Sequence, residues 1–359
     1  MTFSARVTAL TQDVILPKVV DSVLGSNVLV ARLMGNAKKW KGETLRIPVK
    51  VSNSGTASSF AGLDTFTAAV FDTKQRLSFD VRGVRQPIAL SGMEVAVNKI
   101  TESQVIDMVK EAFEEGQQEL IDEIGDQVYG DGTGNTNKDL LGLGAAVDDG
   151  TDVVTYGGLS RTTFPVLNAT RTASGGTLTL ARLATLYSAV SSGSMSGTTP
   201  TIIISNETVF DLYEQLLTPT LRHSYQETGM PLVGMKGGLT TREGLVGKHG
   251  FVALSYKGIP WVRDEKSTAQ TVWMLNENYL HWYGVDVKGT FGYNSVSLSS
   301  GTIDGVYDKA PMDNFSGFGW SGFRAPTNQF GGIGDLILMG NIVSGQPRRH
   351  GRLTGVTTV

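Results

Sequence analysis

The stretch TESQVIDMVKEAFEEGQQELIDEIGDQVYG, residues 101–130, carries the strongest helical pattern in the chain. Thr101, with Gln104 three residues later, forms a capping box that marks the start of a helix, and Gly130 marks its end. Apolar residues recur with helical spacing along one side and are Val105, Met108, Val109, Ala112, Phe113, Leu120, Ile121 and Ile124. The opposite side is acidic and consists of Glu111, Glu114, Glu115, Glu119, Asp122, Glu123 and Asp126. At ~1.5 Å per residue this helix is about 40 Å long, so we predict a spine to which other elements attach.

Upstream of this helix, two short segments alternate between apolar and polar residues, as strands with one buried face do. They are TLRIPVKV, residues 44–51, and RLSFDVR, residues 76–82, and a segment rich in Gly, Ser and Thr joins them. Pairing the two strands gives a β-ribbon with an apolar face of Leu45, Ile47, Val49, Val51, Leu77, Phe79 and Val81. A lone two-stranded ribbon is marginally stable in water. The apolar face therefore needs a packing partner, which the local sequence does not supply.

The rest of the chain predicts a mixture of helices and strands. Helices are expected over residues 7–34, 178–190 and 206–217, and strands over 201–205 and 335–343, the second being the last strand. Two strand pairs are expected around turns at Lys257–Gly258 and Asn276–Asn278. The glycine-rich residues 226–250 predict a mobile loop, and residues 284–332 predict irregular structure. This order of elements indicates an α+β or mixed α/β fold in more than one lobe.

The composition excludes several classes of protein. The 359 residues include no cysteine, which rules out disulfides, thiolate metal sites and thiol nucleophiles. The net charge of −3 lacks the basic excess of proteins that grip nucleic acid through its phosphates. The first 18 residues show no secretory signal, and the longest apolar runs are too short to span a bilayer. We expect an ordinary globular protein without a membrane segment.

Two glycine-rich motifs resemble binding loops but fit poorly. GDGTGNTNKD, residues 130–139, follows a helix and lacks the closing Lys-Ser or Lys-Thr of a phosphate loop. Read as a calcium loop, it lacks the glycine at the sixth position, and Gly142 stands where the twelfth-position acid belongs. A tight turn after the helix is the preferred interpretation, and an ion site there is left as an open alternative. GFGWSG, residues 317–322, does not follow a strand pattern, so we expect no dinucleotide site.

No group of residues in the sequence has the spacing of a catalytic site. The four histidines are scattered and lack metal-ligand spacing, and no nucleophile elbow is present. The acids of the long helix are better explained by a solvated face than by acid–base chemistry. RRHGR, residues 348–352, is interpreted as a short basic tail on a loop, with weak potential for phosphate contact. We therefore predict no catalytic, cofactor-binding or metal-binding residues.

The order of elements resembles that of the major capsid proteins of tailed double-stranded-DNA phages, whose coat fold is shared with encapsulins and the herpesvirus capsid floor. LTQDVILPKVVDSVLGSNVLVARLM resembles the N-terminal arm, and GETLRIPVKV with RLSFDVRG resembles the extended loop. The long helix with GDGTGNTNKDLLGL resembles the spine helix and its turn, and TPTIIISNETVFDLYEQLL resembles a unit of the axial domain. The resemblance implies an arm (1–43), an extended loop (44–90), a peripheral domain (91–170), an axial domain (171–290) and a return with a tail (291–359).

The resemblance also implies how the ribbon is used. In that family the extended loop lies on a neighbouring subunit, so the apolar ribbon face defined above is expected to be buried between chains. Hexamers and pentamers would then close into an icosahedral virion shell, assembled in the host cytoplasm around DNA that it contacts non-specifically. The arm begins within about ten residues of Met1, so assembly would need a separate scaffolding protein or none; portal and cement proteins are further candidate partners. Lys50 and Lys74 are candidates for the cross-linking lysine of some relatives, although a plain surface role is the default.

Two other functions stay open at this point. The first is an encapsulin-type shell that encloses an enzyme cargo, which an apolar pocket for a cargo peptide would favour. The second is a globular enzyme of unknown chemistry that uses its glycine loops for a nucleotide. The slightly acidic net charge of −3 suits a shell around DNA, because a strongly basic inner wall would bind phosphates and oppose packaging.

Overall fold

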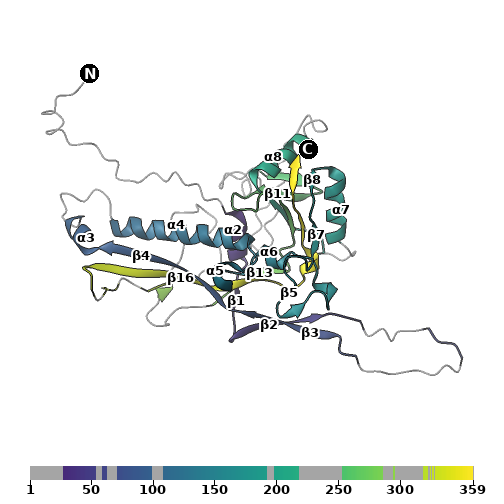
Figure 1. Cartoon of the computed structure of the whole chain (residues 1–359), viewed down its shortest axis with the longest axis horizontal. Coiled ribbons are helices and arrows are strands. Elements are labelled where there is room, and N and C mark those ends of the chain that lie inside the picture. The colour runs from purple at the N-terminus through teal and green to yellow at the C-terminus, as the bar shows by residue number, and fades with distance from the viewer. Residues whose placement is uncertain are drawn as a thin grey trace, which may run out of the picture.

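A computed structural model describes most of the chain. It covers residues 27–53, 59–62, 71–98, 108–191, 198–217, 253–285, 294–295, 318–321, 324, 326 and 328–358. The described residues form two lobes and a projecting ribbon, each built around β-strands (Figure 1). The expected arm before residue 27, the helix start at 101–107 and the loop at 226–250 lie outside the described residues.

The first lobe consists of the long helix packed along a six-stranded sheet. Its central strand is β16 (Gly331–Ser344), which pairs with β4 (Arg82–Ser91) along the full length of β4. The other strands are β13 (Leu280–Gly284), β15 (Phe318–Trp320), β14 (Asn294–Ser295) and β1 (Lys38–Lys39). Helix α4 (Met108–Tyr129) runs beside β4 and β16 in Figure 1. The predicted spine helix is thus confirmed over these residues.

The apolar side of α4 packs into the core of this lobe. Leu120, Ile124 and Val128 are buried and share one core with Ile88 of β4 and Leu336 of β16. Gly116 allows the close approach, because a Cβ on Gly116 would lie 2.7 Å from Ile88 Cδ1. The acidic side is exposed at Glu115, Glu119, Glu123 and Asp126, as its sequence pattern predicts.

The second lobe is a six-stranded sheet with helices on one face. The strand order is β10 (Ala253–Tyr256), β11 (Ile259–Arg263), β9 (Ile202–Ser205), β12 (Val272–Leu275), β17 (Gly351–Leu353) and β7 (Thr170–Thr172). Helices α7 (Leu180–Val190) and α8 (Glu207–Leu217) share a core with Ile203, whereas Ile202 and Ile204 on the other face join the core of the first lobe. Because β9 is buried on both faces, its sequence is continuously apolar. These helices and β9 lie where the sequence predicts them.

The remaining elements are short. They are α2 (Val28–Gly35), α3 (Gly92–Asn98), α5 (Gly134–Asn137), α6 (Leu143–Ala146), β5 (Thr155–Tyr156), β6 (Leu159–Ser160), η1 (Pro165–Leu167), β8 (Gly176–Thr177), η4 (Pro347–Arg349) and β18 (Val356–Thr358).

Helix α2 is held at both ends by carboxylates of the second lobe. Leu29 N–H donates to Asp264 at 3.2 Å, and Arg32 binds Glu277 through two contacts of 2.5 and 2.7 Å. The segment leading into the ribbon is therefore fixed to both lobes.

Several sequence expectations need correction. The turn at Asn276–Asn278 does not join a strand pair: β12 pairs with β9 and β17, whereas β13 pairs with β16 in the other sheet. The strand at 335–343 is not the last, because β17 and β18 follow it. The ribbon does not extend to residue 90, because β4 belongs to the first sheet. Alternating apolar residues identify a strand but not the sheet that it joins.

The RRHGR segment is also different from the expected loop-like tail. Arg352 is buried in β17 and forms ion pairs with the fully buried Asp148 and with Asp152. Arg161, also fully buried, lies 3.5 Å from Asp148. The cationic groups are thus paired inside the protein, because buried charges require partners. This removes the weak expectation of a phosphate contact at Arg352.

Candidate intersubunit interface

The predicted ribbon is present and projects from the body of the chain (Figure 1). Strand β2 (Thr44–Lys50) pairs antiparallel with β3 (Lys74–Asp80), in a register that places Ile47 opposite Leu77 and Leu45 opposite Phe79. Strand β2 carries Pro48, which lacks an N–H and suits a strand at a sheet edge. The alternation seen in the sequence therefore gives one apolar and one polar face.

Part of the apolar face packs on the chain's own body. Leu77 and Phe79 are fully buried, at 0% and 1% exposure, and contact the β5–β6 hairpin. Phe79 meets the ring of Tyr156 edge-on at 5.2 Å between centroids, and Ser78 N–H donates to Gly157 O at 2.8 Å. The hairpin thus packs against β3 and forms a backbone hydrogen bond with it. These contacts fix the direction in which the ribbon leaves the lobe.

Tyr156 connects this hairpin to the central strand of the first lobe. Its hydroxyl accepts a hydrogen bond from Ser344 N–H at 2.9 Å, and the guanidinium of Arg161 lies 5.0 Å from its ring centroid. Complete burial raises the pKa of Tyr156 to about 12, so the phenol stays neutral. The ribbon base is therefore supported by a buried, hydrogen-bonded network.

These contacts correct the expectation that the apolar face lacks a partner within its own chain. The seven predicted interface residues divide into two groups. Leu77 and Phe79 belong to the chain's core. Leu45, Ile47, Val49 and Val81 pack against the same core but are partly exposed, as is Val51. A role between chains stays a prediction for all seven. The β5–β6 hairpin was not predicted from the sequence. The glycine pair in TYGGLS, residues 155–160, is nevertheless a recognisable hairpin signal.

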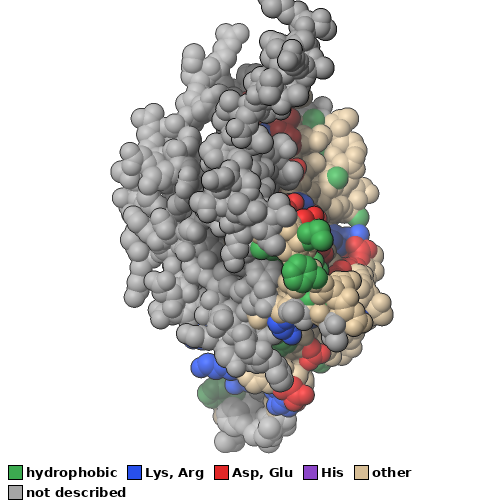
Figure 2. All heavy atoms as spheres, turned by 90° about the vertical axis from the view of Figure 1, so that its left-hand side faces the viewer, with side chains coloured by type: hydrophobic (Ala, Val, Ile, Leu, Met, Phe, Trp, Pro, Cys, Tyr) green, Lys and Arg blue, Asp and Glu red, His purple; other side chains and the backbone are tan. Residues whose placement is uncertain are grey.

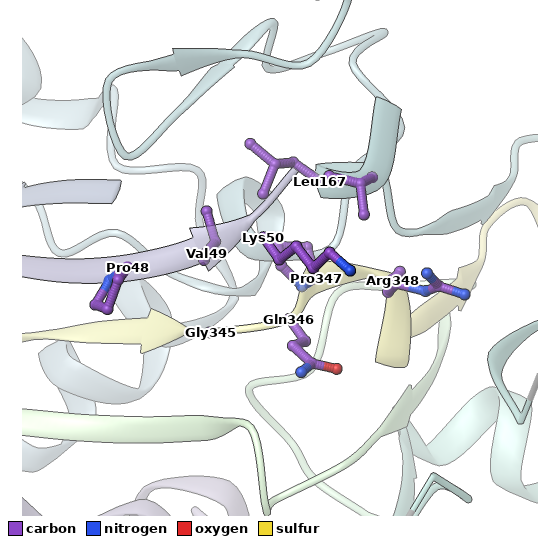
Figure 3. Close-up of a pocket in the computed structure, with 9 residues that line it drawn as sticks. Pro48, Val49, Lys50, Leu167, Gly345, Gln346, Pro347 and Arg348 are labelled. Carbon is purple, nitrogen blue, oxygen red and sulfur yellow. The ribbon is translucent and has the colours of Figure 1, made fainter. Parts of the chain in front are cut away.

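A small pocket of about 220 Å³ lies beside the ribbon (Figure 3). Pro48, Val49 and Lys50 of β2 form one wall, and the facing walls come from η1 and from residues 345–348 around η4. Lys50 and Arg348 bring two cationic groups to its lining. The pocket contains no carboxylate in its lining, so it offers apolar and cationic contacts.

Two more exposed apolar side chains lie at the far end of the first lobe. Met93 is 70% exposed and Phe330 79% exposed, and Gly92 N–H donates to Phe330 O at 3.0 Å. Figure 2 looks onto this end of the molecule and shows hydrophobic side chains gathered beside charged ones. Large exposed apolar side chains that lie together are typical of contact surfaces.

The glycine motifs form turns in the structure. Asn135, Thr136 and Asn137 have positive φ, and Asp131 caps its own turn by accepting from Thr133 N–H at 2.9 Å. These hydrogen bonds lower the pKa of Asp131. In GFGWSG, Gly319 lies in β15 instead of at the start of a helix. Among the described residues, no cluster of three or more histidine and acidic side chains could hold a metal ion. None of the described helices is long and apolar enough to cross a membrane.

Comparison with known proteins identifies the fold. No family model matches the sequence, and no curated protein matches it. Among solved structures, the capsid of cyanophage A-1(L) matches with a TM-score of 0.77 at 16% identity, over 99% of this chain and 100% of that one. An encapsulin of Synechococcus elongatus matches with a TM-score of 0.56 at 11% identity, over 99% and 96% of the two chains. The capsid of Myoviridae phage XM1 gives 0.56 at 11% identity, over 99% of each chain. The chain thus has the α+β fold of phage major capsid proteins, which confirms the predicted fold.

Proposed function

We propose that this chain is a structural major capsid protein, which assembles as hexamers and pentamers into the icosahedral virion shell of a tailed phage. The observation that carries the proposal is the likeness to the cyanophage capsid, with a TM-score of 0.77 over 99% of this chain and 100% of that one. The protein would act by assembly and not by catalysis.

The shape of the subunit supports assembly into rings. The ribbon leaves one end of the first lobe, whereas α3 lies at the opposite end (Figure 1). Met93 belongs to α3, and both Met93 and Phe330 are exposed. Different surfaces at opposite ends produce head-to-tail contacts, which close into rings when the rotation between copies allows it. The partly exposed residues Leu45, Ile47, Val49, Val51 and Val81 are the proposed contact face of the ribbon.

The segments predicted from sequence acquire proposed roles in such a ring. The ribbon would serve as the extended loop, the lobe of α4 as the peripheral domain and the lobe of α7 and α8 as the axial domain. Strand β17 shows that the C-terminal segment also contributes to the second lobe. DNA would be contacted non-specifically, and a scaffolding, portal or cement protein would be a separate partner.

An encapsulin-type compartment is the second candidate, because an encapsulin has the same fold. Its TM-score of 0.56 is lower than the 0.77 of the cyanophage capsid. The two functions differ in what the shell encloses. The second candidate predicts a protein cargo, and the first predicts DNA.

Electron microscopy of the purified, recombinantly expressed chain tests the proposal. Closed shells or hexameric and pentameric rings are the expected result. Particles recovered from a natural host lysate should contain nuclease-protected DNA. A chain that stays monomeric at high concentration, with and without a co-expressed scaffolding protein, would overturn the proposal, and shells filled with a single enzyme would establish the encapsulin alternative.

A further inference from the structure

The pocket beside the ribbon combines positive charge with aliphatic walls (Figure 3). Lys50 of β2 and Arg348 of η4 supply the charge, and both side chains are exposed. Leu167 and Pro347 are buried and Val166 is half-buried, so the walls that face β2 are aliphatic. The pocket volume of about 220 Å³ exceeds the ~150 Å³ of a cavity that holds a benzene ring. The pocket is therefore large enough for one side chain of a ligand.

The two cations of the pocket have no ion-pair partner in the described part of the chain. No described carboxylate lies within ion-pair distance of Lys50 or Arg348. The buried arginines differ, because Arg161 and Arg352 both lie against the carboxylate of Asp148. The chain thus neutralises its interior cations and leaves the charges of the pocket open to an anion.

The backbone of β2 adds a further donor at Lys50. Ser78 N–H donates to Gly157 O outside the ribbon, so Ser78 and its partner Arg46 form a non-hydrogen-bonded pair. Hydrogen-bonded and non-hydrogen-bonded pairs alternate along an antiparallel ladder, so Lys50, four residues further along β2, is also in a non-hydrogen-bonded pair. Its N–H therefore points away from β3. Pro48, on the same edge, has no N–H that would need an acceptor.

The walls opposite β2 are held in place by the chain itself. The short helices η1 and η4 contact each other, and each begins with a proline. Leu167 N–H donates to Phe164 O at 3.0 Å, and His350 N–H donates to Pro347 O at 2.9 Å, so both turns are closed by hydrogen bonds. A preformed site loses little conformational entropy when a ligand binds.

We propose that this pocket binds an acidic peptide segment of a partner protein, in which a carboxylate lies next to an aliphatic side chain. The carboxylate accepts from Lys50 and Arg348, and charge-assisted hydrogen bonds of this kind are stronger than neutral ones. The aliphatic side chain packs on Leu167 and Pro347 and so removes apolar surface from water. A bare phosphate lacks this apolar part. The inference goes beyond the proposed shell, because it assigns a recognition site for a second protein whatever the shell encloses.

Saturation-transfer NMR of the wild-type protein with three short peptides tests the chemistry of the ligand. The probe is acetyl-Leu-Asp-Leu-amide; acetyl-Leu-Asn-Leu-amide lacks the charge, and acetyl-Gly-Asp-Gly-amide lacks the aliphatic side chains. The probe should bind roughly tenfold more tightly than either control peptide, and added salt should weaken its binding. Equal binding of the three peptides, or no binding of the probe, would overturn the proposal. Displacement of the probe by an equal concentration of inorganic phosphate would also overturn it and would assign the pocket to phosphate groups.

Paired variants test whether the probe binds in this pocket. Lys50→Gln with Arg348→Gln should lower the affinity for acetyl-Leu-Asp-Leu-amide roughly tenfold. Lys39→Gln with Lys41→Gln removes two exposed cations outside the pocket and is the matched control, which should bind as the wild type does. All four side chains are exposed, so the circular dichroism spectra should be unchanged.

Two results with these proteins would contradict the inference. An unchanged affinity in the Lys50→Gln, Arg348→Gln variant would show that the peptide binds elsewhere. Binding of the probe by free subunits but not by assembled particles would show that another copy of the chain covers the pocket, which would overturn a partner protein as the occupant. Binding by both forms, lost in the pocket variant alone, is the result that supports the proposal.

Discussion

The backbone of Gly157 lies directly against the side chain of Leu77. A Cβ on Gly157 would come within 2.8 Å of Leu77 Cδ2 and within 2.9 Å of Phe79 Cζ, distances that real Cβ atoms do not adopt. Gly157 also has φ +56°, a conformation that glycine tolerates best. The hairpin that carries Gly157 therefore determines how closely the ribbon base approaches the lobe.

Gly157→Ala should destabilise the protein and loosen the ribbon base. The added methyl group must displace two fully buried side chains and also strains the backbone, which together cost about 1–3 kcal/mol of unfolding free energy. Gly158→Ala is the matched control, because Gly158 also has a positive φ but a Cβ added there would meet no atom within 4 Å. Urea denaturation of both variants should show a clearly larger loss for Gly157→Ala; equal losses would mean that packing at Gly157 is unimportant.

Acid should weaken the fold through His350. Its Nδ1 accepts a hydrogen bond from Asn276 N–H at 3.2 Å, and its Nε2 lies 2.9 Å from Ser344 Oγ, so the buried ring is held neutral. Burial, with a smaller repulsion from His281, lowers the pKa of His350 from 6.5 to about 3. The unfolded chain then binds a proton that the folded chain excludes, so this stability is complete above pH 6.5 and is lost as the pH falls towards 3.

Between pH 7 and pH 5, this single histidine should lower the free energy of unfolding by about 2 kcal/mol. Urea denaturation at several pH values measures the effect, and most carboxylates titrate below this window. His350→Gln keeps a polar side chain but removes the titration, so its stability should vary less with pH, even if the variant is weaker overall. An unchanged pH dependence in His350→Gln would contradict this assignment.

The buried carboxylate of Asp264 should be needed to dock α2. It accepts hydrogen bonds from Leu29 N–H, from the Tyr129 hydroxyl at 2.9 Å and from Lys266 N–H at 3.1 Å. Burial raises its pKa, and these donors partly offset that rise. Asp264→Ala would leave the buried donors unsatisfied and should cost about 1–3 kcal/mol.

Asp264→Asn retains one acceptor oxygen and should cost less than Asp264→Ala. The exposed neighbour Glu265 provides the control, because Glu265→Ala removes a carboxylate from the same loop without touching α2. Thermal unfolding of the three variants should show the largest loss of stability for Asp264→Ala, a smaller loss for Asp264→Asn and the smallest for Glu265→Ala. A loss for Glu265→Ala as large as that for Asp264→Ala would show that the loop, and not the carboxylate, matters.

The elements that could be predicted from sequence are those whose periodicity is local. The apolar stripe of α4, the alternation within each ribbon strand and the apolar spacing of helix α7 are patterns that each lie within a single element. Which sheet β13 joins, and what covers Leu77, depend on contacts between residues far apart in the chain. The burial of Arg352 was missed for the same reason, since its partner Asp148 lies 204 residues away. A charged side chain in an isolated sequence gives no sign of a distant buried partner.

The remaining prediction separates the two halves of the ribbon's apolar face. Ile47 and Val49 are partly exposed, whereas Leu77 and Phe79 are fully buried against the hairpin. Replacing Ile47 and Val49 by Asp should cost the isolated subunit little more than about 1–3 kcal/mol, because carboxylates on a partly exposed face keep contact with water. In an assembled shell the same carboxylates would be buried without partners at every contact, so assembly should be lost.

Leu77→Ala should behave in the opposite way. Its truncation opens a cavity in the subunit's own core and should cost about 2–5 kcal/mol of folding stability before any effect on assembly. Arg46→Asp with Lys50→Asp, on the other face, tests charge and not apolar burial, so its assembly defect should weaken as salt screens the charges, whereas that of the Ile47 and Val49 variant should not. Circular dichroism with urea denaturation measures folding, and sedimentation velocity measures assembly. Normal shells from the Ile47→Asp, Val49→Asp variant would show that this face is not between subunits, and outright unfolding would assign all of it to the subunit core.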